Sequence, residues 1–353
     1  MQKTVAKIYL ENIRNNAKAF KALTGVPICA VVKADAYGHG AEEVALALQS
    51  EVGLFAVSLL DEALAIRVAV CGKDILVLTP PLDDSDIATG GYNAFILTVG
   101  DLYTANKVAK FARNRQIPVR VHLKVNTGMN RYGMNLQTLG KACALFAKTP
   151  LVRVEGVYSH LHGSTLATAE KQRLEFVRAV KICRGYFPSI KSHLSATYGA
   201  LLGQKFAFDF VRIGIGLYGY LPDGAQGIAC APTLKKGMEV YAIVATNRKF
   251  TGGVTGYGEQ IQTRNGENLA ILRVGYADGF LRKKDNGTCN ANDNANNLCM
   301  DACLRFGEYR RGEFVPIMTN ALETAKTTGT IPYEVLCAST RRAHKIYMDL
   351  ETE

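Results

Sequence analysis

The segment Ile28-Cys29-Ala30-Val31-Val32-Lys33-Ala34-Asp35-Ala36-Tyr37-Gly38-His39-Gly40 decides the fold class of this chain. Its first five residues are apolar, and the run predicts a short buried strand. The strand leads directly into Lys33 and a glycine-punctuated turn, after which residues 41–48 have the periodicity of a helix. A strand followed at once by a helix is typical of the βα units of a parallel sheet.

The same alternation continues through the first two thirds of the chain. Further strands are expected at 54–57, 75–78, 94–99, 119–125, 152–159, 191–195 and 211–217. Helical periodicity separates them, for example over 61–70, 102–113, 136–148 and 167–186. Eight strands in roughly 220 residues match a (β/α)8 barrel, and a doubly wound open sheet is the alternative.

The pattern changes near Thr233. Helical periodicity fades from Gly237 onward, and strand-like runs at 240–246 and 269–274 are punctuated by glycines. The sequence therefore predicts an α/β protein of two domains. These are a TIM-like barrel over residues 1–232 and a smaller, mostly β domain over residues 233–353. The polar, Asn-rich stretch 283–297 is expected to be a loop.

The composition of the 353 residues disfavours several classes of protein. The net charge is +11, but the basic residues occur in short, separate groups. This favours attraction of small anions into a cleft over nucleic-acid binding. No run approaches 18 uninterrupted apolar residues, and the N-terminus lacks the apolar core of a signal peptide, so no membrane span is expected. The nine cysteines include no CxxC pair, which disfavours a zinc site and indicates a cytoplasmic protein.

Lys33 is the first candidate for chemistry because it directly follows a buried strand. In a parallel barrel, functional groups lie just after the strands, at their C-terminal ends. Burial lowers the pKa of an ammonium, which suits an amine that forms a Schiff base. The alternative is a lysine whose stem packs on the barrel rim while its ammonium stays in water.

A series of further motifs follows in order along the chain. They are KVNTGMNR at 124–131, Ser159-His160, RIGI at 212–215, Gly256-Tyr257-Gly258, GYADG at 275–279, Cys299-Met300-Asp301 and Tyr333-Glu334. With the Lys33 segment, the series resembles the alanine racemase family over nearly the whole chain. The resemblance implies an isomerase that interconverts L- and D-alanine, with pyridoxal 5'-phosphate bound covalently to Lys33.

The resemblance also implies two acid–base groups on opposite faces of the cofactor, Lys33 and Tyr257. Racemisation needs two, because a proton leaves one face of Cα and arrives at the other. A free tyrosine titrates near pH 10, and His160 is implied to help Tyr257 toward the phenolate through a hydrogen bond. Without the resemblance, Tyr257 would be interpreted as a turn residue packed between glycines.

Arg212 is implied to meet the pyridine nitrogen of the cofactor. A guanidinium keeps its proton at ordinary pH, so it would leave the ring nitrogen unprotonated, which fits racemisation better than transamination. The alternative is an arginine that ties the barrel mouth to an acid such as Asp209.

Further residues are implied to bind the phosphate and the substrate. The phosphate would contact Gly214, Ile215, Thr197, Tyr37 and Tyr333. Thr197 follows Ala196 where the family usually has Asn-Ser. Arg131 and Met300 would bind the substrate, and Lys124 matches a lysine that is often carbamylated, which would orient Arg131. The Asn-rich stretch stands where the family has a β-hairpin. Either the loops are shorter in this protein, or residues are absent from the sequence.

Two other functions stay open at this point. A serine or broad-specificity amino-acid racemase is the nearer one, although the ring of Tyr333 would crowd a larger side chain. A non-catalytic pyridoxal-phosphate carrier is the other, and Tyr257 and the extension after residue 232 argue against it. The family also implies a homodimer in which Tyr257 and Met300 act on Lys33 of the partner subunit. The role that the family implies for this protein is the supply of D-alanine for the cell wall.

Overall fold

The computed structural model describes residues 4–163, 165–222, 224–225, 228, 230–256, 261–262, 265–281 and 298–348. The chain divides into two compact units, which we name the barrel unit and the β unit. The barrel unit contains Arg14–Ala34 and Ala41–Leu234, and the β unit contains Met1–Ile13, Asp35–Gly40 and Lys235–Glu353. Tyr257 and the Asn-rich stretch 283–297 lie outside the described residues.

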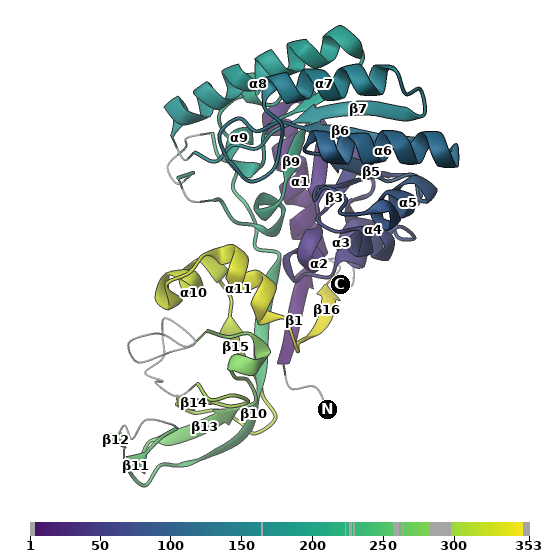
Figure 1. Cartoon of the computed structure of the whole chain (residues 1–353). Helices are drawn as coiled ribbons and strands as arrows, with labels where there is room; N and C mark the ends of the chain where they lie inside the picture. Colours follow the sequence, from purple (N-terminus) through teal and green to yellow (C-terminus); the bar gives the residue numbers. More distant parts are fainter. Residues whose placement is uncertain are drawn as a thin grey trace. The chain divides into compact units, whose positions relative to one another are not determined.

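The barrel unit is built on eight parallel strands (Figure 1), which follow one another in the order β8-β7-β6-β5-β4-β3-β2-β9. They are β2 (Ile28–Val31), β3 (Leu54–Val57), β4 (Asp74–Val77), β5 (Ile96–Val99), β6 (Val119–Lys124), β7 (Val152–Tyr158), β8 (Lys191–His193) and β9 (Val211–Ile213). The two end strands are joined by two backbone hydrogen bonds, from Asp209 N to Ser192 O (3.0 Å) and from Arg212 N to Ser195 O (2.9 Å). The sheet is therefore a nearly closed barrel. The predicted (β/α)8 fold is confirmed, and the open sheet is wrong.

Helices alternate with these strands. They are α1 (Leu10–Thr24), α2 (Lys33–Tyr37), α3 (Ala41–Leu48), α4 (Leu60–Ile66), α5 (Asp84–Tyr92), α6 (Leu102–Arg115), α7 (Leu136–Ala147), α8 (Leu166–Tyr186) and α9 (Thr197–Ala200). Short 3₁₀ turns, η1 (Gln204–Phe206) and η2 (Ile215–Tyr218), flank β9. Four of the helices begin at a side chain that accepts a backbone N–H, namely Asp83, Asp101, Asn135 and Thr165. These caps fix where each strand-to-helix loop ends.

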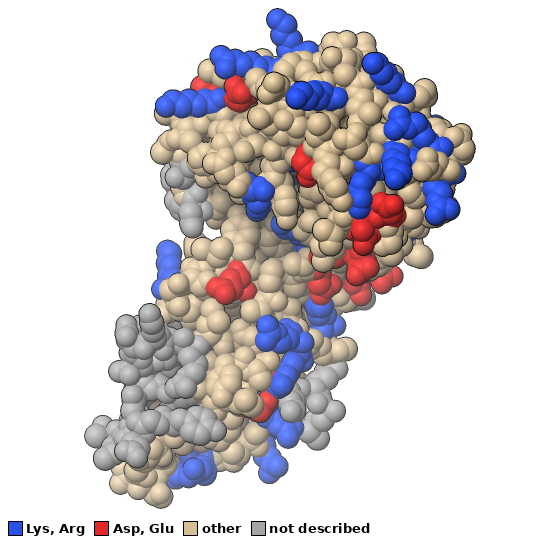
Figure 2. Space-filling view, viewed as in Figure 1, with Lys and Arg blue, Asp and Glu red and all other residues tan. Residues whose placement is uncertain are grey.

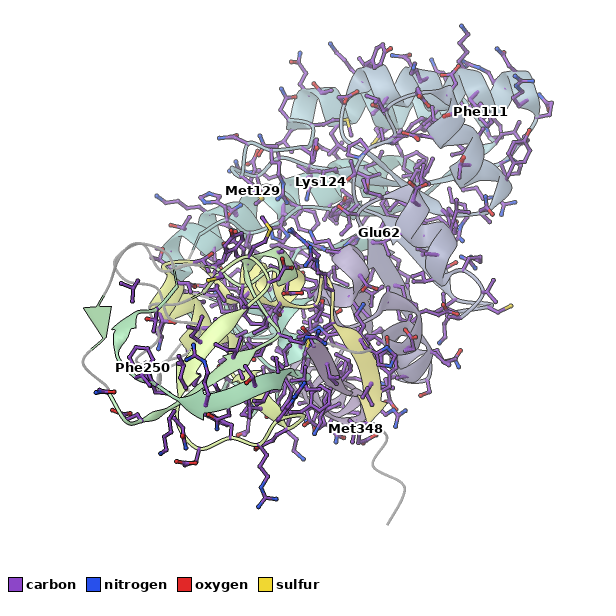
Figure 3. All side chains as sticks on the ribbon, turned by 90° about the horizontal axis from the view of Figure 1, so that it is seen from below. Glu62, Phe111, Lys124, Met129, Phe250 and Met348 are labelled. Atoms are coloured by element: carbon purple, nitrogen blue, oxygen red, sulfur yellow. The ribbon has the colours of Figure 1, made fainter. Side chains whose placement is uncertain are left out.

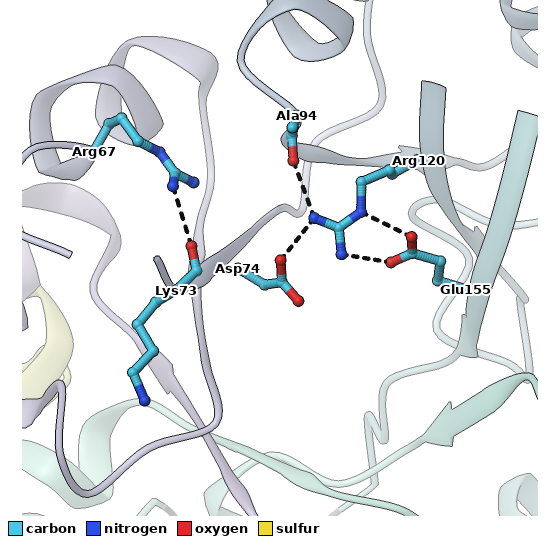
Figure 4. Close-up of polar contacts among 6 residues, drawn as sticks. All are labelled: Arg67, Lys73, Asp74, Ala94, Arg120 and Glu155. Atoms are coloured by element: carbon cyan, nitrogen blue, oxygen red, sulfur yellow. Dashed lines mark hydrogen bonds and ion pairs between the residues drawn. The ribbon is translucent and has the colours of Figure 1, made fainter. Parts of the chain in front are cut away.

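Arg120 joins four neighbouring strands at one end of the barrel (Figure 4). Its guanidinium donates to both carboxylate oxygens of Glu155 in β7 (2.8 and 2.7 Å) and to Asp74 at the start of β4 (2.6 Å). It also donates to the carbonyl of Ala94, just before β5 (3.2 Å). This network lies near the strand N-termini and leaves the opposite end, where Lys33 follows β2 and Lys124 ends β6, for binding.

The β unit is built on a six-stranded sheet with the order β14-β13-β10-β1-β16, and β15 also pairs with β10. Its strands are β1 (Thr4–Tyr9), β10 (Met238–Lys249), β13 (Asn268–Leu272), β14 (Cys303–Phe306), β15 (Phe314–Met318) and β16 (His344–Met348). A two-stranded sheet of β11 (Gly253–Val254) and β12 (Ile261–Gln262), the 3₁₀ turn η3 (Tyr276–Asp278) and helices α10 (Ala321–Thr328) and α11 (Pro332–Ser339) complete it. The predicted mostly β character of this region is confirmed.

β1 pairs with two strands from the far end of the chain. The strand pairs antiparallel with β10, where Thr4 faces Ala242, and parallel with β16, where Val5 faces His344. Partners this far along the chain leave no local pattern in the sequence. The β unit therefore takes residues from both ends of the chain.

The surface of the chain carries its basic side chains in scattered positions. Figure 2 shows lysines and arginines spread singly and in small groups over the visible face, without one continuous stripe. Among the described helices, none is long and apolar enough to cross a membrane. No group of three or more His, Cys, Asp or Glu side chains in the described part of the chain could hold a metal ion.

Candidate active site

Arg212 in β9 is the most extensively hydrogen-bonded side chain inside the barrel, and it is only 3% exposed. Its Nη1 donates to Nδ1 of His193 (2.7 Å) and to the carbonyl of the same residue (3.2 Å). Its Nη2 donates to the carbonyls of Ser159 (2.8 Å) and Leu194 (3.0 Å) and lies 3.4 Å from Nδ1 of His160. Within the described residues, Nε of Arg212 makes no hydrogen bond, so this N–H is left to donate to a ligand.

The alternative pairing of Arg212 with Asp209 is wrong. The Asp209 carboxylate accepts instead from the amide (2.7 Å) and the hydroxyl (2.6 Å) of Ser192 and lies 3.9 Å from Arg184. The guanidinium of Arg212 therefore meets carbonyls and imidazoles, and its charge is not neutralised by that acid.

His193 and His122 extend the Arg212 network toward the barrel interior. Nε2 of His193 lies 3.0 Å from Nδ1 of His122. A guanidinium can only donate, so Nδ1 of His193 accepts, and its proton lies on Nε2, from which it is donated to His122. The His193 ring is stacked on Tyr158 (4.8 Å between centroids) and Phe210 (4.2 Å), which holds its orientation.

Both imidazoles of this network are neutral. Removal from water lowers the pKa of His193 well below its usual value, and the charge of Arg212 lowers it further. The same two causes, together with the charge of Arg120, lower the pKa of His122 to about 3. A neutral pair is what the tautomer assignment requires, because a protonated His193 ring would have no nitrogen able to accept from Arg212.

Lys124, labelled in Figure 3, ends β6 as a buried amine without a carboxylate partner among the described residues. Its Nζ lies 4.2 Å from the ring centroid of Tyr158, and the guanidinium of Arg212 lies 5.2 Å from the same ring. Removal from water lowers the pKa of Lys124 well below its usual value, and the charges of Arg212 and Arg131 lower it further. An uncharged amine is the form that reacts as a nucleophile.

His160 follows β7 and receives the fields of four cations at once. Its pKa lies well below the usual value, first because of removal from water and then because of the charges of Arg212, Lys124, Arg131 and Lys33. The sequence-predicted residues Lys33, Lys124, Arg131, His160 and Arg212 therefore lie within electrostatic reach of one another. Their excess of positive charge attracts a small anionic ligand.

The turn after β9 offers backbone donors next to this cationic group. Gly214 precedes the 3₁₀ turn η2, and Ile215 is its first residue; amides at such a start have no partner within the turn. The amide of Gly216 donates to the hydroxyl of Thr197 (3.2 Å). No hydrogen bond among the described residues involves the amides of Gly214 or Ile215, so Thr197 lies beside two free donors. This arrangement suits a phosphate.

Lys33 leaves β2 through an unusual backbone segment. Ala34, Asp35, Ala36 and Tyr37 have φ values of +52, +54, +52 and +54°, so α2 is a left-handed turn of four residues that carry Cβ atoms. Each such residue costs about 1–2 kcal/mol relative to the right-handed form. Strain of this kind is kept where a fixed geometry is needed.

Tyr37, Tyr333 and Met300 belong to the β unit. The rings of Tyr37 and Tyr333 lie 6.0 Å apart, and Tyr37 is buried. Met300 is 52% exposed, and its carbonyl accepts the amide of Ala277 (3.1 Å). Tyr257 lies outside the described residues.

Several residues of the site have no obvious signal in the sequence. His193 and His122 lie inside predicted strands, where a histidine is usually interpreted as an ordinary core residue. Gln172 donates to the hydroxyl of Thr127 (3.1 Å) and to the carbonyl of His160 (3.2 Å), and so orders the loop after β7 from helix α8. A polar residue buried on the apolar face of a helix is the sign that could have identified it.

Comparisons with known proteins match this geometry. The family model of the alanine racemase N-terminal domain matches residues 8–222, and that of the C-terminal domain matches residues 238–347. Curated alanine racemases of Francisella tularensis subsp. mediasiatica (strain FSC147) and Desulfovibrio desulfuricans are each 30% identical. The first comparison covers 94% of this chain and 96% of the relative, and the second covers 98% of both.

Solved structures agree with the sequence relatives. The alanine racemase of Clostridium difficile 630 superposes with a TM-score of 0.88 at 28% identity, covering 99% of this chain and 96% of that one. The alanine racemase of Bacillus anthracis with bound L-Ala-P superposes with a TM-score of 0.90 at 26% identity, covering 100% and 96%. The two family models, the curated relatives and these structures together show that the chain belongs to the alanine racemase family.

Proposed function

We propose that this protein is an alanine racemase that interconverts L- and D-alanine with pyridoxal 5'-phosphate held on Lys33. The observation that carries the proposal is Arg212, whose Nη atoms are held by His193, Ser159 and Leu194 in a chain that matches both alanine racemase family models. The basic side chains near His160 favour an anionic ligand at this end of the barrel.

The donors of this site fit pyridoxal phosphate. The amides of Gly214 and Ile215 and the hydroxyl of Thr197 suit the phosphate, and the unused Nε of Arg212 suits the pyridine nitrogen, which accepts. When bound, the cofactor withdraws electrons from the substrate Cα and so acidifies its C–H bond. A solved structure of an alanine racemase from Bartonella henselae is described with covalently bound pyridoxal phosphate.

Arg212 has the task of keeping the ring nitrogen unprotonated. Its Nη atoms are already committed to His193, Ser159 and Leu194, so the guanidinium cannot turn away from the position that these bonds fix. A donor that does not give up its proton limits the electron withdrawal by the ring. This favours return of a proton to Cα over transfer of the amino group.

Proton transfer is assigned to Lys33 and Tyr257. Lys33 acts on one face of Cα and Tyr257 on the other, and His160 assists Tyr257 through a hydrogen bond. The neutral state of His160 supports this role, because its Nδ1 faces the guanidinium of Arg212, so the ring proton lies on Nε2 and can be donated to the phenolic oxygen of Tyr257, which stabilises the phenolate.

Substrate binding is assigned to Arg131 and Met300, with Arg131 also facing the phenolic oxygen of the cofactor. Lys124 is the proposed site of carbamylation. It is buried, lacks a carboxylate partner among the described residues and has a lowered pKa. A carbamate would replace the amine of Lys124 with an anion that orients Arg131.

The β unit is assigned two further contributions. Tyr37 and Tyr333 contact the phosphate side, and Tyr257 and Met300 act on Lys33 of the partner subunit in a homodimer. This function requires only two ligands, the small amino acid and the cofactor. It suits a cytoplasmic enzyme that supplies D-alanine for the cell wall.

Chiral chromatography tests this function directly. Purified protein supplied with pyridoxal phosphate should convert L-alanine and D-alanine to the same mixture, and Lys33→Ala should abolish the conversion. Faster conversion of serine than of alanine would show that serine, and not alanine, is the preferred substrate. Retained activity in Lys33→Ala would refute the function.

The role of Tyr257 has a separate test. Tyr257→Phe in deuterium oxide should still exchange the Cα proton of one alanine enantiomer while exchange on the other falls sharply. Equal exchange of both enantiomers would refute the assignment of Tyr257 as the second acid–base group.

A further inference from the structure

We infer that Glu62 is a positioning residue for the reactive lysine: its carboxylate holds the backbone next to Lys33. The inference rests on the proposed function and adds to it a residue that does not touch the cofactor. Glu62 lies in the first turn of α4 and is labelled in Figure 3.

Both oxygens of the Glu62 carboxylate are used. Oε1 accepts the amide of Ala34 (2.7 Å), the residue directly after Lys33. Oε2 accepts the amides of Ser58 (2.7 Å) and Leu59 (3.0 Å), which form the loop between β3 and α4. One side chain therefore joins the exit of β2 to the exit of the neighbouring strand β3.

The backbone on the other side of Lys33 is also fixed. The carbonyl of Val31 accepts the hydroxyl of the fully buried Tyr218 (3.0 Å), and the amide of Val32 donates to the carbonyl of Ala56 (2.9 Å). With the bond from Ala34 to Glu62, Lys33 lies between two fixed amides. Its Cα position is then set by β3 and by the loop that follows β3.

The bond to Glu62 has a specific purpose at this position. Ala34 begins the left-handed segment with φ +52°, a conformation that alanine adopts only when its surroundings hold it there. Ala34 is exposed, so without Glu62 its amide would bond to water and the chain could relax to a right-handed conformation. That relaxation would change the direction in which the Lys33 side chain leaves the strand.

Glu62 differs from an ordinary helix-capping residue in its bond to Ala34. The bonds to Ser58 and Leu59 are local to the start of α4, and losing them costs stability only. The bond to Ala34 spans two βα units and acts on the position of Lys33. Asp83 provides the matched control, because its carboxylate accepts the amides of Ser85 (2.8 Å) and Asp86 (3.0 Å) at the start of α5 and has no bond to Ala34.

The experiment compares Glu62→Ala with Asp83→Ala. In the cofactor-free proteins, deuterium exchange at the Ala34 amide should be about tenfold faster or more in Glu62→Ala and unchanged in Asp83→Ala. Titration with pyridoxal phosphate should show weaker binding, and kcat for alanine should fall about tenfold or more, in Glu62→Ala only. Similar melting temperatures for the two variants would show that stability is matched.

A rescue variant makes the test specific. Glycine adopts positive φ without penalty, so Ala34→Gly in the Glu62→Ala background should recover part of the lost cofactor affinity and kcat. Equal losses in Asp83→Ala, or faster Ala34 exchange with unchanged cofactor binding and kcat, would overturn the inference. Failure of the unsubstituted protein to bind pyridoxal phosphate would instead refute the proposed function, because that result does not depend on Glu62.

Discussion

His193→Phe tests whether a neutral imidazole holds Arg212 in place. Phenylalanine keeps a ring stacked against Tyr158 and Phe210 but removes both hydrogen bonds of the imidazole, at 2.7 Å to Arg212 and 3.0 Å to His122. A hydrogen bond to a charged group contributes about 1.5–3 kcal/mol, and leaving the buried His122 nitrogen unsatisfied costs about 1–3 kcal/mol. We therefore expect the free energy of unfolding to fall by about 3–5 kcal/mol at neutral pH.

The stability difference between the unsubstituted protein and His193→Phe should also depend on pH. The pKa of His193 is lower in the folded state than in the unfolded state because the ring is buried and faces Arg212. The unfolded chain therefore binds more protons below about pH 6.5, so the native protein loses about 1.4 kcal/mol of stability per pH unit through this residue. His193→Phe has no imidazole at this position, so it does not lose stability in acid through this residue. The difference between the two proteins should narrow by about 2 kcal/mol between pH 6.5 and about pH 5.

Urea unfolding followed by circular dichroism measures both quantities on the cofactor-free proteins, since the chain has no tryptophan. Tyr158→Phe is the control, because it removes the 2.8 Å bond to Thr98 and keeps the stacked ring and both histidines. Its difference from the unsubstituted protein should not change between those pH values. A His193→Phe difference that stays constant or widens in acid would refute the neutral imidazole and the tautomer derived from it.

Three further predictions concern the barrel and the substrate side. Arg120→Met should lower the free energy of unfolding by about 1–2 kcal/mol, because its carboxylate partners are partly exposed and screened. The effect should fade in acid as Asp74, whose pKa is lowered by its hydrogen bond to Arg120, becomes protonated; a difference that persists there would contradict the ion-pair explanation. Equilibration with ¹³C-bicarbonate should give a carbamate signal in the unsubstituted protein and none in Lys124→Met, and equal signals in both would exclude Lys124 as the carbamylated residue. Arg131→Lys should raise KM for alanine about tenfold or more with a smaller change in kcat, whereas an unchanged KM would remove Arg131 from the substrate site.

The barrel could be predicted because most of its strands lie in short, mainly apolar runs that are followed by helical periodicity. That pattern depends on burial alone, and parallel strands are buried on both faces. The pairing of β1 could not be predicted, because its partner strands β10 and β16 lie more than 200 residues away in the sequence.

The site shows the same division between local and distant causes. Lys33, Lys124 and His160 were predictable because each follows or ends a strand, and Arg212 because it lies in the RIGI run of the last strand. The left-handed turn after Lys33 was not, because alanine and aspartate there give no sign of positive φ. Glu62 reads as a helix-capping residue, and only the fold brings its carboxylate to Ala34.

Reduction with borohydride, followed by peptide mass analysis, tests the central claim most directly. The protein incubated with pyridoxal phosphate and then reduced should carry one pyridoxyl phosphate group, on the peptide that contains Lys33. Lys33→Ala treated in the same way should carry none at that position. A label on another lysine, or no label in the unsubstituted protein, would contradict the assignment of Lys33 as the residue that holds the cofactor.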